Sequence, residues 1–398
     1  MRPLNPTLNI DVAIVGGGIA GLWLLARLRQ HGYGALLIEN ERLGAGQTVC
    51  AQGIVHGGAK YSLGGQLSDS ATAIAGMPEL WRRCLNGAGD IDLRAARLLA
   101  DHQYLWATRA PTSQLAAFFA SKLMRGRMEK VAGADVGDYP SALRHPRFQG
   151  TVYRLEEPIV DVASVLAAFA ERYQDSIVLH QGPVTPKADG TLNLRHAGQP
   201  TWVIRPTCTV FTAGAGNAAL PWAMQQLRPL HMVMARGPAL PGLLYAHCLG
   251  ASDVPRLTVT SHTDASGRLV WYLGGGLAED GVQRDRREQI HAARRELEAL
   301  LPWVDWSRAE FATFTVQRAE AHQPRGTRPA EPGIYRNERV LAAWPTKLAL
   351  APLLAERVEA MLRTLGARPR RVDLRVLADW PRPEIAVPPW DRGDLEWS

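Results

Sequence analysis

The sequence predicts an α/β protein in which a second domain, built on a mixed or antiparallel sheet, is inserted into a helix-covered parallel-sheet domain. Three observations predict this architecture. A strand, a glycine-rich turn, a helix and a second strand follow one another within residues 10–39. Strand-and-turn segments that suit the same sheet recur in the middle of the chain and near its end. Several strand-like segments lie between them, which indicates that a separate unit interrupts the first domain.

The N-terminal segments are typical of one βαβ unit. Residues 10–15 are almost continuously apolar and end at Gly16, as expected for a buried parallel strand. Residues 19–31 carry apolar side chains at helical spacing, and Gly32 closes the helix. Residues 35–39 form the second apolar strand. About thirty residues are the minimum for such a parallel crossover.

Apolar periodicity predicts the structure of the remaining segments. We expect residues 66–130 to be mainly helical. Further helices are expected at residues 162–173, 287–301 and 351–365. Strands are expected at residues 152–161, 177–179, 191–195, 209–212, 230–234, 256–261, 269–273 and 340–342.

The first domain is expected to be discontinuous. We assign to it residues 1–80, 150–220 and 335–370, and to the inserted domain residues 81–149 and 221–334. Residues 371–398 form a C-terminal tail, which we expect to be loosely held after Asp379 because it is rich in proline.

Composition excludes several classes of protein. The net charge is +7, but the arginine runs alternate with acids or lie near the C-terminus, so they do not form the basic face with stacking aromatics that nucleic-acid binding needs. The excess charge suits anionic ligands instead. The four cysteines are widely separated, which argues against a disulfide framework and a structural zinc. With neither a signal peptide nor an apolar run long enough to span a membrane, we expect a cytoplasmic protein without metal or integral membrane segment.

The turn after the first strand carries a dinucleotide-binding motif. In Gly16-Gly-Gly18-Ile-Ala-Gly21, the first glycine permits the tight turn, the second admits the pyrophosphate, and the third lets the helix pack on the sheet. The phosphates would meet the N-terminal end of the helix. Glu39, at the end of the second strand, would accept hydrogen bonds from the ribose hydroxyls and repel a 2′-phosphate, which disfavours NADP.

Residues 42–58 favour FAD over NAD, because a loop rich in glycine and small polar residues stands where a nicotinamide enzyme normally has a plain helix. Residues 53–61 (GIVHGGAKY) resemble the second motif of the D-amino-acid-oxidase-like flavoproteins, in the version of glycerol-3-phosphate dehydrogenases and hydroxyglutarate oxidases. Residues 209–216 are similar to the family's mid-chain strand and turn beside the cofactor, and residues 340–352 to the segment that closes over the flavin ring. The family also includes glycine and sarcosine oxidases.

The resemblance covers nearly the whole chain. It implies a Rossmann-like FAD-binding domain with an inserted substrate domain, and FAD held non-covalently. Motif and resemblance together give these expected cofactor-binding residues: Gly16, Gly18, Ala20, Gly21, Glu39, Asn40, Gln47, Thr48, Gln52, Gly53, Val184, Ala213, Gly214, Thr346, Lys347 and Leu348. The backbone of Val184 is expected to meet the adenine part.

Two positions depart from the family's pattern. Trp344-Pro-Thr-Lys347 replaces the usual glycine-rich turn before the last helix. Lys347 would either place a positive charge near the flavin N1 and C2 oxygen or face water at the start of the helix. Cys50 stands where some relatives tether the flavin through histidine, but a buried structural cysteine is its expected role.

Candidate substrate-binding residues follow from the same comparison. The loop of His56 is expected to pass beside the flavin ring, although a structural histidine is the alternative. Arg318 falls where relatives keep the arginine that binds a substrate carboxylate, and a surface ion pair is its alternative. His262 and Tyr272 lie on strands that resemble the family's pocket hairpin, although ordinary strand packing explains them equally well.

The sequence therefore predicts an FAD-dependent oxidoreductase that oxidises a small amine or amino acid, by hydride transfer to flavin N5. The substrate is expected to be small and anionic or zwitterionic. A dehydrogenase or oxidase of a 2-hydroxy acid or a polyol phosphate is the alternative, favoured by the His56 segment. A non-catalytic flavoprotein, its pocket blocked near Trp344, is the second alternative. The electron acceptor and the oligomeric state stay open.

Overall fold

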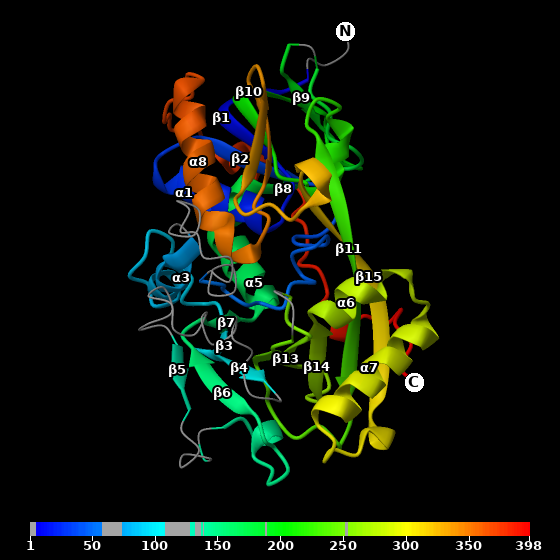
Figure 1. Ribbon diagram of the computed structural model, residues 1–398. Coiled ribbons are helices and arrows are strands. Elements are labelled where there is room, and N and C mark those ends of the chain that lie inside the picture. The colour runs from blue at the N-terminus through cyan, green and yellow to red at the C-terminus, as the bar shows by residue number, and fades with distance from the viewer. Residues whose placement is uncertain are drawn as a thin grey trace.

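The computed structural model describes residues 5–57, 74–107, 128–131, 137, 139–187, 189–250 and 254–398. Its two large sheets lie at opposite ends of the molecule in the view of Figure 1. The fold is α/β, with a Rossmann-like sheet and a second, largely antiparallel sheet, as predicted.

The first sheet has the strand order β16-β17-β10-β1-β2-β8, and β9 pairs with β10. Neighbours from β17 to β8 pair in parallel, while β16 and β9 add antiparallel edges. The strands are β1 (Thr7–Val15), β2 (Ala35–Glu39), β8 (Ile177–Leu179), β9 (Leu192–Leu194), β10 (Trp202–Phe211), β16 (Gly333–Asn337) and β17 (Val340–Trp344).

Helices and the C-terminal tail cover the two faces of this sheet. Its main core packs against α1 (Ile19–Gln30), α5 (Val162–Tyr173) and α8 (Ala351–Thr364). The helix α3 (Met77–Leu85) adds Trp81, whose indole donates to the carbonyl of Ala349. On the other side, Leu374, Leu377 and Trp380 of the tail pack against apolar residues of β1, β2 and β10.

The second sheet has the order β15-β11-β14-β13-β12-β4-β6-β5, with only β12 and β4 parallel among its described pairs. Its strands are β4 (Gln103–Ala107), β5 (Met128–Lys130), β6 (Thr151–Leu155), β11 (Gln225–Arg236), β12 (Ala246–Cys248), β13 (Leu257–Thr263), β14 (Leu269–Gly274) and β15 (Glu310–Ala321). The helices α6 (Gly276–Asp280) and α7 (Arg286–Leu300) pack beside it. A two-stranded sheet joins β3 (Leu98–Ala100) to β7 (Ile159–Val160).

The mainly helical structure expected for residues 66–130 is wrong for the described part of that segment. Only α3 is a helix there, whereas β3, β4 and β5 are strands. The aromatic and apolar side chains of β4 suit a buried strand with partners on both sides, and pairing with β6 and β12 decides its conformation. Residues 66–73 and 108–127 lie outside the described residues.

The expectation that the tail is loosely held after Asp379 is also wrong. Trp380 is almost fully buried, and its indole donates to the carbonyl of Leu179 at 2.7 Å. Leu43 and Ile385 form an isolated bridge, and the chain ends in backbone hydrogen bonds to Phe311. Proline excludes regular helix and sheet here, but side-chain and backbone contacts still fix the segment.

Candidate functional site

The turn between β1 and α1 is shaped by two glycines. Gly16 has a φ of 107°, and a Cβ there would lie 2.6 Å from the Cα of Ala213. A Cβ on Gly21 would lie 2.0 Å from the carbonyl oxygen of Gly16. Gly18 is different, because its backbone is in an ordinary extended conformation and its Cβ would meet only Thr48 Oγ1, at 3.1 Å. Gly16 and Gly21 are therefore required by packing, and Gly18 keeps the space above the helix clear.

The N-terminal end of α1 is suited to an anionic ligand. Gly18, the N-cap residue, provides no side-chain cap, and Thr48 Oγ1 accepts a hydrogen bond from the Ile19 amide at 3.2 Å. The first amides of a helix lack partners within the helix and carry the positive end of its dipole. Phosphate groups are commonly bound in such a position.

Glu39 is held at the carboxyl end of β2. Its carboxylate accepts hydrogen bonds from the amides of Gly17 at 2.5 Å, Asn40 at 2.8 Å and Glu41 at 2.9 Å. These donors orient the side chain beside the glycine turn, where it lines the same cavity. The residues at this turn therefore fit the diphosphate and ribose of a dinucleotide.

Two adjoining cavities extend from this turn. The first, of about 590 Å³, follows the glycine turn, the end of β2 and the turn after β10, and we refer to it as the cofactor cavity. The second, of about 520 Å³, lies against β11, β15 and the loop of residues 47–56, and we refer to it as the substrate-side cavity. Gln47, Thr48 and Cys50 line both, so one long ligand can extend from one into the other.

Fifteen of the sixteen expected cofactor-binding residues line one of these cavities. Gly21 is the exception, since its place is the contact between α1 and the turn. Those on the cofactor cavity are Gly16, Gly18, Ala20, Glu39, Asn40, Gln47, Thr48, Val184, Ala213 and Gly214. Those on the substrate-side cavity include Gln52, Gly53, Thr346, Lys347 and Leu348.

The segment that departs from the family's glycine-rich turn still adopts a glycine-like conformation. Thr346 has a φ of 65°, in the left-handed region, and its hydroxyl donates to the carbonyl of Glu331 at 2.9 Å. The water-facing alternative for Lys347 is wrong, because the residue is 7% exposed and lines the substrate-side cavity. The indole of Trp344 donates to the carbonyl of Gly214 at 3.1 Å, which holds the ring against the turn.

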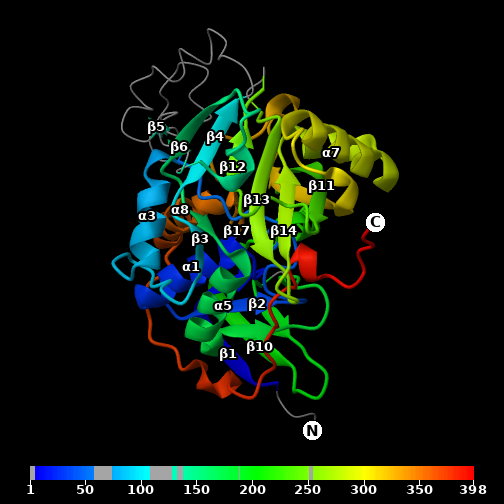
Figure 2. The same ribbon diagram turned by 90° about the horizontal axis from the view of Figure 1, so that it is seen from below.

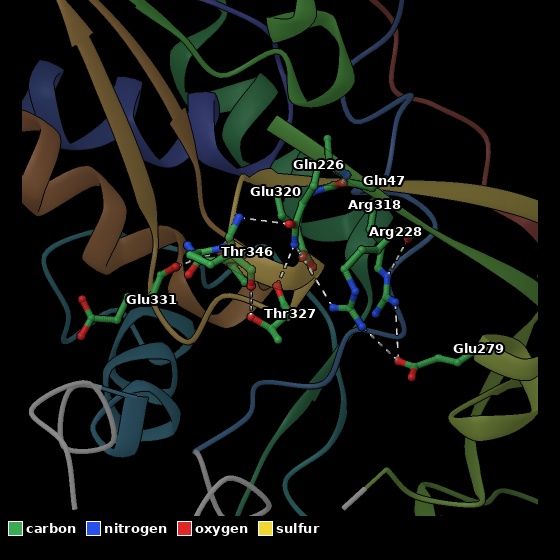
Figure 3. Close-up of polar contacts among 12 residues, drawn as sticks. Gln47, Gln226, Arg228, Glu279, Arg318, Glu320, Thr327, Glu331 and Thr346 are labelled. Carbon is green, nitrogen blue, oxygen red and sulfur yellow. Dashed lines mark hydrogen bonds and ion pairs between the residues drawn. The ribbon is translucent and has the colours of Figure 1, made fainter. Parts of the chain in front are cut away.

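Two arginines reach the substrate-side cavity from neighbouring strands. Arg228 of β11 and Arg318 of β15 are direct partners in the antiparallel register, and both extend towards Glu279 of α6 (Figure 3). The Glu279 carboxylate lies 3.5 Å from Arg318 and 4.0 Å from Arg228. Arg228 also lies 3.5 Å from the buried carboxylate of Glu320.

The carboxylate contacts of the arginine pair are long, at 3.5 to 4.0 Å. Two like charges directly opposite each other on paired strands repel. Burial lowers the pKa of Arg318, and the neighbouring Arg328 and Arg228 lower it further. An anionic ligand between the two guanidiniums would reduce the repulsion and the cost of burial.

His56 also lines the substrate-side cavity. Its Nδ1 is 3.4 Å from Glu157 Oε2, and the Glu157 carboxylate also accepts from the Gly57 amide and from Gln103 Nε2, each at 2.6 Å. The ring of His56 stacks on that of His247, with centroids 5.7 Å apart. His247 lines the cavity as well. A buried carboxylate on Nδ1 fixes the orientation of the imidazole at the cavity.

The structure does not bring His262 and Tyr272 into the site. Among the described residues that line the two cavities, neither is present. Tyr272 is fully buried and donates to the carbonyl of Cys50 at 2.8 Å. His262 stacks on Trp390 and bonds Thr260, and burial lowers its pKa to about 3. Both side chains support the cavity wall from behind.

Cys50 touches both cavities, and its carbonyl is held by Tyr272. Burial raises the pKa of its thiol to about 11, and the nearby Arg392 opposes this effect. The thiolate is the reactive form of cysteine, so this environment disfavours a thioether to a ligand. The geometry therefore supports non-covalent binding.

The site contains charged residues that the sequence did not single out. They include Arg228, His247, Glu279 and Arg328 on the substrate-side cavity, Arg392 on the cofactor cavity, and Glu157 behind His56. Each lies in a segment without a recognisable motif. Only Arg228 could have been found by further reasoning. Once β11 and β15 are known to pair, their register places Arg228 opposite Arg318.

Among the described residues, no group of three or more His, Cys, Asp or Glu side chains is arranged to hold a metal ion. In the same part of the chain, no helix has the length and hydrophobicity needed to cross a membrane.

Comparison with known proteins agrees with this geometry. Residues 11–358 match the model of the FAD dependent oxidoreductase family, DAO. The probable FAD-dependent oxidoreductase PA4991 of Pseudomonas aeruginosa is 46% identical over 391 residues, which cover 96% of this chain and 98% of the relative. The crystal structure of PA4991 superposes with a TM-score of 0.82, at 42% identity and over 97% of this chain and 99% of that one.

More distant solved structures share the fold. Glycine oxidase from Geobacillus kaustophilus has a TM-score of 0.63 at 17% identity, and the match covers 92% of this chain and 97% of that one. L-α-glycerophosphate oxidase from Mycoplasma pneumoniae, with FAD bound, has a TM-score of 0.62 at 12% identity, over 96% and 98% of the two chains. The chain is therefore an FAD-dependent oxidoreductase and belongs to the D-amino-acid-oxidase-like (DAO) family.

Proposed function

We propose that this enzyme oxidises a small amino acid or carboxylate-bearing amine, which it binds through Arg318 and Arg228. The observation that carries the proposal is the pair of arginines, which are cross-strand partners on the wall of the cavity that adjoins the cofactor cavity. When bound, FAD accepts two electrons from the substrate as a hydride. The part of the protein is to bind, orient and deprotonate that substrate.

The lining of the substrate-side cavity has a charged part and an apolar part. Leu230 and Met232 follow Arg228 along β11, and Val316 precedes Arg318 along β15. All three line the same cavity. A carboxylate would lie between the guanidiniums, and a short apolar side chain would lie against these three residues. Planar guanidinium groups suit a carboxylate because they can bind it with two parallel hydrogen bonds.

His56 is the proton acceptor in this proposal. An ammonium group must lose a proton before its carbon can give up a hydride, and His56 faces the cavity with Glu157 behind its Nδ1. Lys347, buried on the same cavity, adds a positive charge to the region.

We also propose a cytoplasmic location, which the four free thiols support.

Oxidation of a 2-hydroxy acid or a polyol phosphate is the second candidate. The His56–Glu157 pair favours it, because an alcohol needs a base more strongly than a neutral amine does. The arginine pair would bind the acid group of either substrate.

One experiment separates the two candidates. Bleaching of the flavin absorbance is followed without oxygen, and each amino acid is compared with the 2-hydroxy acid of the same carbon skeleton. The proposal expects bleaching by amino acids, and much weaker bleaching by amines that lack the carboxylate. Bleaching by hydroxy acids alone would replace it with the second candidate.

The arginine pair is tested directly by Arg318→Gln. Loss of a charge-assisted hydrogen bond costs about 1.5–3 kcal/mol, so KM for the best carboxylate substrate should rise roughly 10- to 100-fold. Arg228→Gln should act in the same direction. The exposed Arg336 of β16 serves as the control, since Arg336→Gln changes the same charge away from both cavities. An unchanged KM in Arg318→Gln would exclude the carboxylate role.

A further inference from the structure

We propose that the C-terminal segment, residues 384–398, forms part of the FAD site and that Arg392 provides a positive charge to the cofactor's diphosphate. The segment runs along the outside of the molecule in Figure 2, where it is red, from the first sheet towards α7 and β11. The inference concerns the cofactor alone and is independent of the substrate.

The segment is tied to both sheets by its backbone. Near its start, the Leu43 amide donates to the carbonyl of Glu384 at 2.8 Å, and the Ala386 amide donates to the carbonyl of Leu43 at 3.0 Å. At its end, Ser398 and Phe311 exchange backbone hydrogen bonds of 2.8 and 3.0 Å. Leu43 belongs to the loop that follows β2, and Phe311 is the second residue of β15. The segment therefore connects the two structural units that enclose the cofactor cavity.

Side chains fix the middle of the segment. Trp390 stacks on His262, with ring centroids 3.9 Å apart and an angle of 17° between the planes. The Asp391 carboxylate accepts from the Ala265 amide at 2.6 Å. Further on, the guanidinium of Arg236 lies 4.0 Å from the ring centre of Trp397. Arg392 is thus held between anchors on either side.

Arg392 faces the cofactor cavity. It lines that cavity together with Phe314, and its guanidinium carbon lies 5.6 Å from the centre of the Phe314 ring. Its Nε and one terminal nitrogen bind the two oxygens of Asp394, at 3.0 and 2.5 Å. Asp394 is the more exposed partner, with a side-chain exposure of 64% against 36% for Arg392.

The charges around the cavity show why this arginine is important. Among the described residues that line it, the charged side chains are Glu39, Glu41, Arg42 and Arg392, which balance one another. The diphosphate of FAD adds negative charge to this balanced set. Arg42 is 49% exposed and pairs with Glu384 at 3.1 Å, so solvent weakens its effect more than that of Arg392.

The test compares two arginines that make the same local contact. Arg375 binds both oxygens of Asp373 two residues earlier in the chain, as Arg392 binds those of Asp394, but it is 84% exposed and does not line either cavity. Flavin-stripped Arg392→Gln and Arg375→Gln proteins are titrated with FAD, ADP and riboflavin, and the release rate of FAD from each holoprotein is measured.

The proposal expects the Kd of Arg392→Gln to rise about tenfold for FAD and ADP, with a weaker dependence on salt, while Arg375→Gln behaves as the unaltered protein. Riboflavin, which lacks phosphate, should bind both variants equally. Equal FAD affinities and release rates in the two variants would overturn the proposal. So would an equal loss of riboflavin and FAD binding, because it would place Arg392 at the ring.

A second readout uses the reciprocity of binding. If Arg392 contacts FAD, then FAD must stabilise the segment that carries Arg392. Digestion by carboxypeptidase should therefore be slower with FAD than without it, and this protection should fall in Arg392→Gln but not in Arg375→Gln. Identical protection in the two variants would contradict the inferred contact.

Discussion

The three glycines of the N-terminal motif have separable roles at the level of single residues. Gly18 borders the cavity and has an ordinary backbone conformation, whereas a Cβ on Gly21 would collide with the backbone at 2.0 Å. We expect Gly18→Val to fold but to lose FAD binding, because its side chain would occupy space above the helix. Gly21→Ala should lose stability even without FAD. Thermal unfolding of the stripped proteins, together with FAD titration, checks both, and FAD retained by Gly18→Val would contradict our placement of the phosphates.

His262 should make stability depend on pH. Burial lowers its pKa to about 3, while the unfolded-state pKa stays near about 6.5, so the unfolded chain binds the proton first as the pH falls. The stability contributed by the neutral imidazole is complete above about pH 6.5 and is lost towards pH 3, by about 1.4 kcal/mol per pH unit. Strand packing was one of the two expectations for His262, but the sequence did not show that Trp390, from far along the chain, covers the ring.

The measurement is the free energy of unfolding between pH 7 and pH 4.5, for the unaltered protein and for His262→Gln. The difference between the two proteins should shrink as the pH falls, since only the unaltered protein carries this titrating group. Asp161 and Arg97 act on the same imidazole with opposite signs, and neither is changed in the comparison. A difference that stays constant with pH would show that His262 is protonated alike in both states.

At the level of elements, the sequence predicted the helices and strands whose conformation depends on nearby residues. The βαβ unit, α5 and α8 were predicted to within about three residues, because glycine turns and apolar periodicity mark them directly. β4 was not recognised, since its conformation depends on partners in β6 and β12 that are distant in the chain. The twelve-residue β15 was missed for the same reason, and with it the pairing of Arg318 with Arg228.

The tail shows a second limit of sequence reasoning. Its prolines correctly exclude regular structure, yet Trp380, Trp390 and Trp397 each pack on a surface supplied by another part of the chain. An aromatic residue in an irregular segment signals burial, but the sequence does not show where that burial occurs. This is why Arg392 was absent from the expected site although it lies beside Cys50 in the fold.

At the level of the whole molecule, the cofactor should act as a structural link. The cofactor cavity is lined by the glycine turn of the first sheet, by β15 of the second sheet and by the tail, so a ligand that fills it would contact all three. A ligand that binds only the folded state stabilises it by an amount that grows with its concentration, about 2.7 kcal/mol at 100 times the Kd. We expect added FAD to raise the unfolding temperature of the stripped protein as a function of concentration.

Binding of FAD should be reversible, because the protein offers no activated thiol where a covalent bond to the flavin would form. The pKa of Cys50 is raised to about 11, which keeps the sulfur protonated at neutral pH. Denaturation of the yellow holoprotein should therefore release all flavin into the supernatant, and Cys50→Ser should release it equally. Flavin that remained with the precipitated chain of the unaltered protein, but not with that of Cys50→Ser, would instead indicate a thioether at this position.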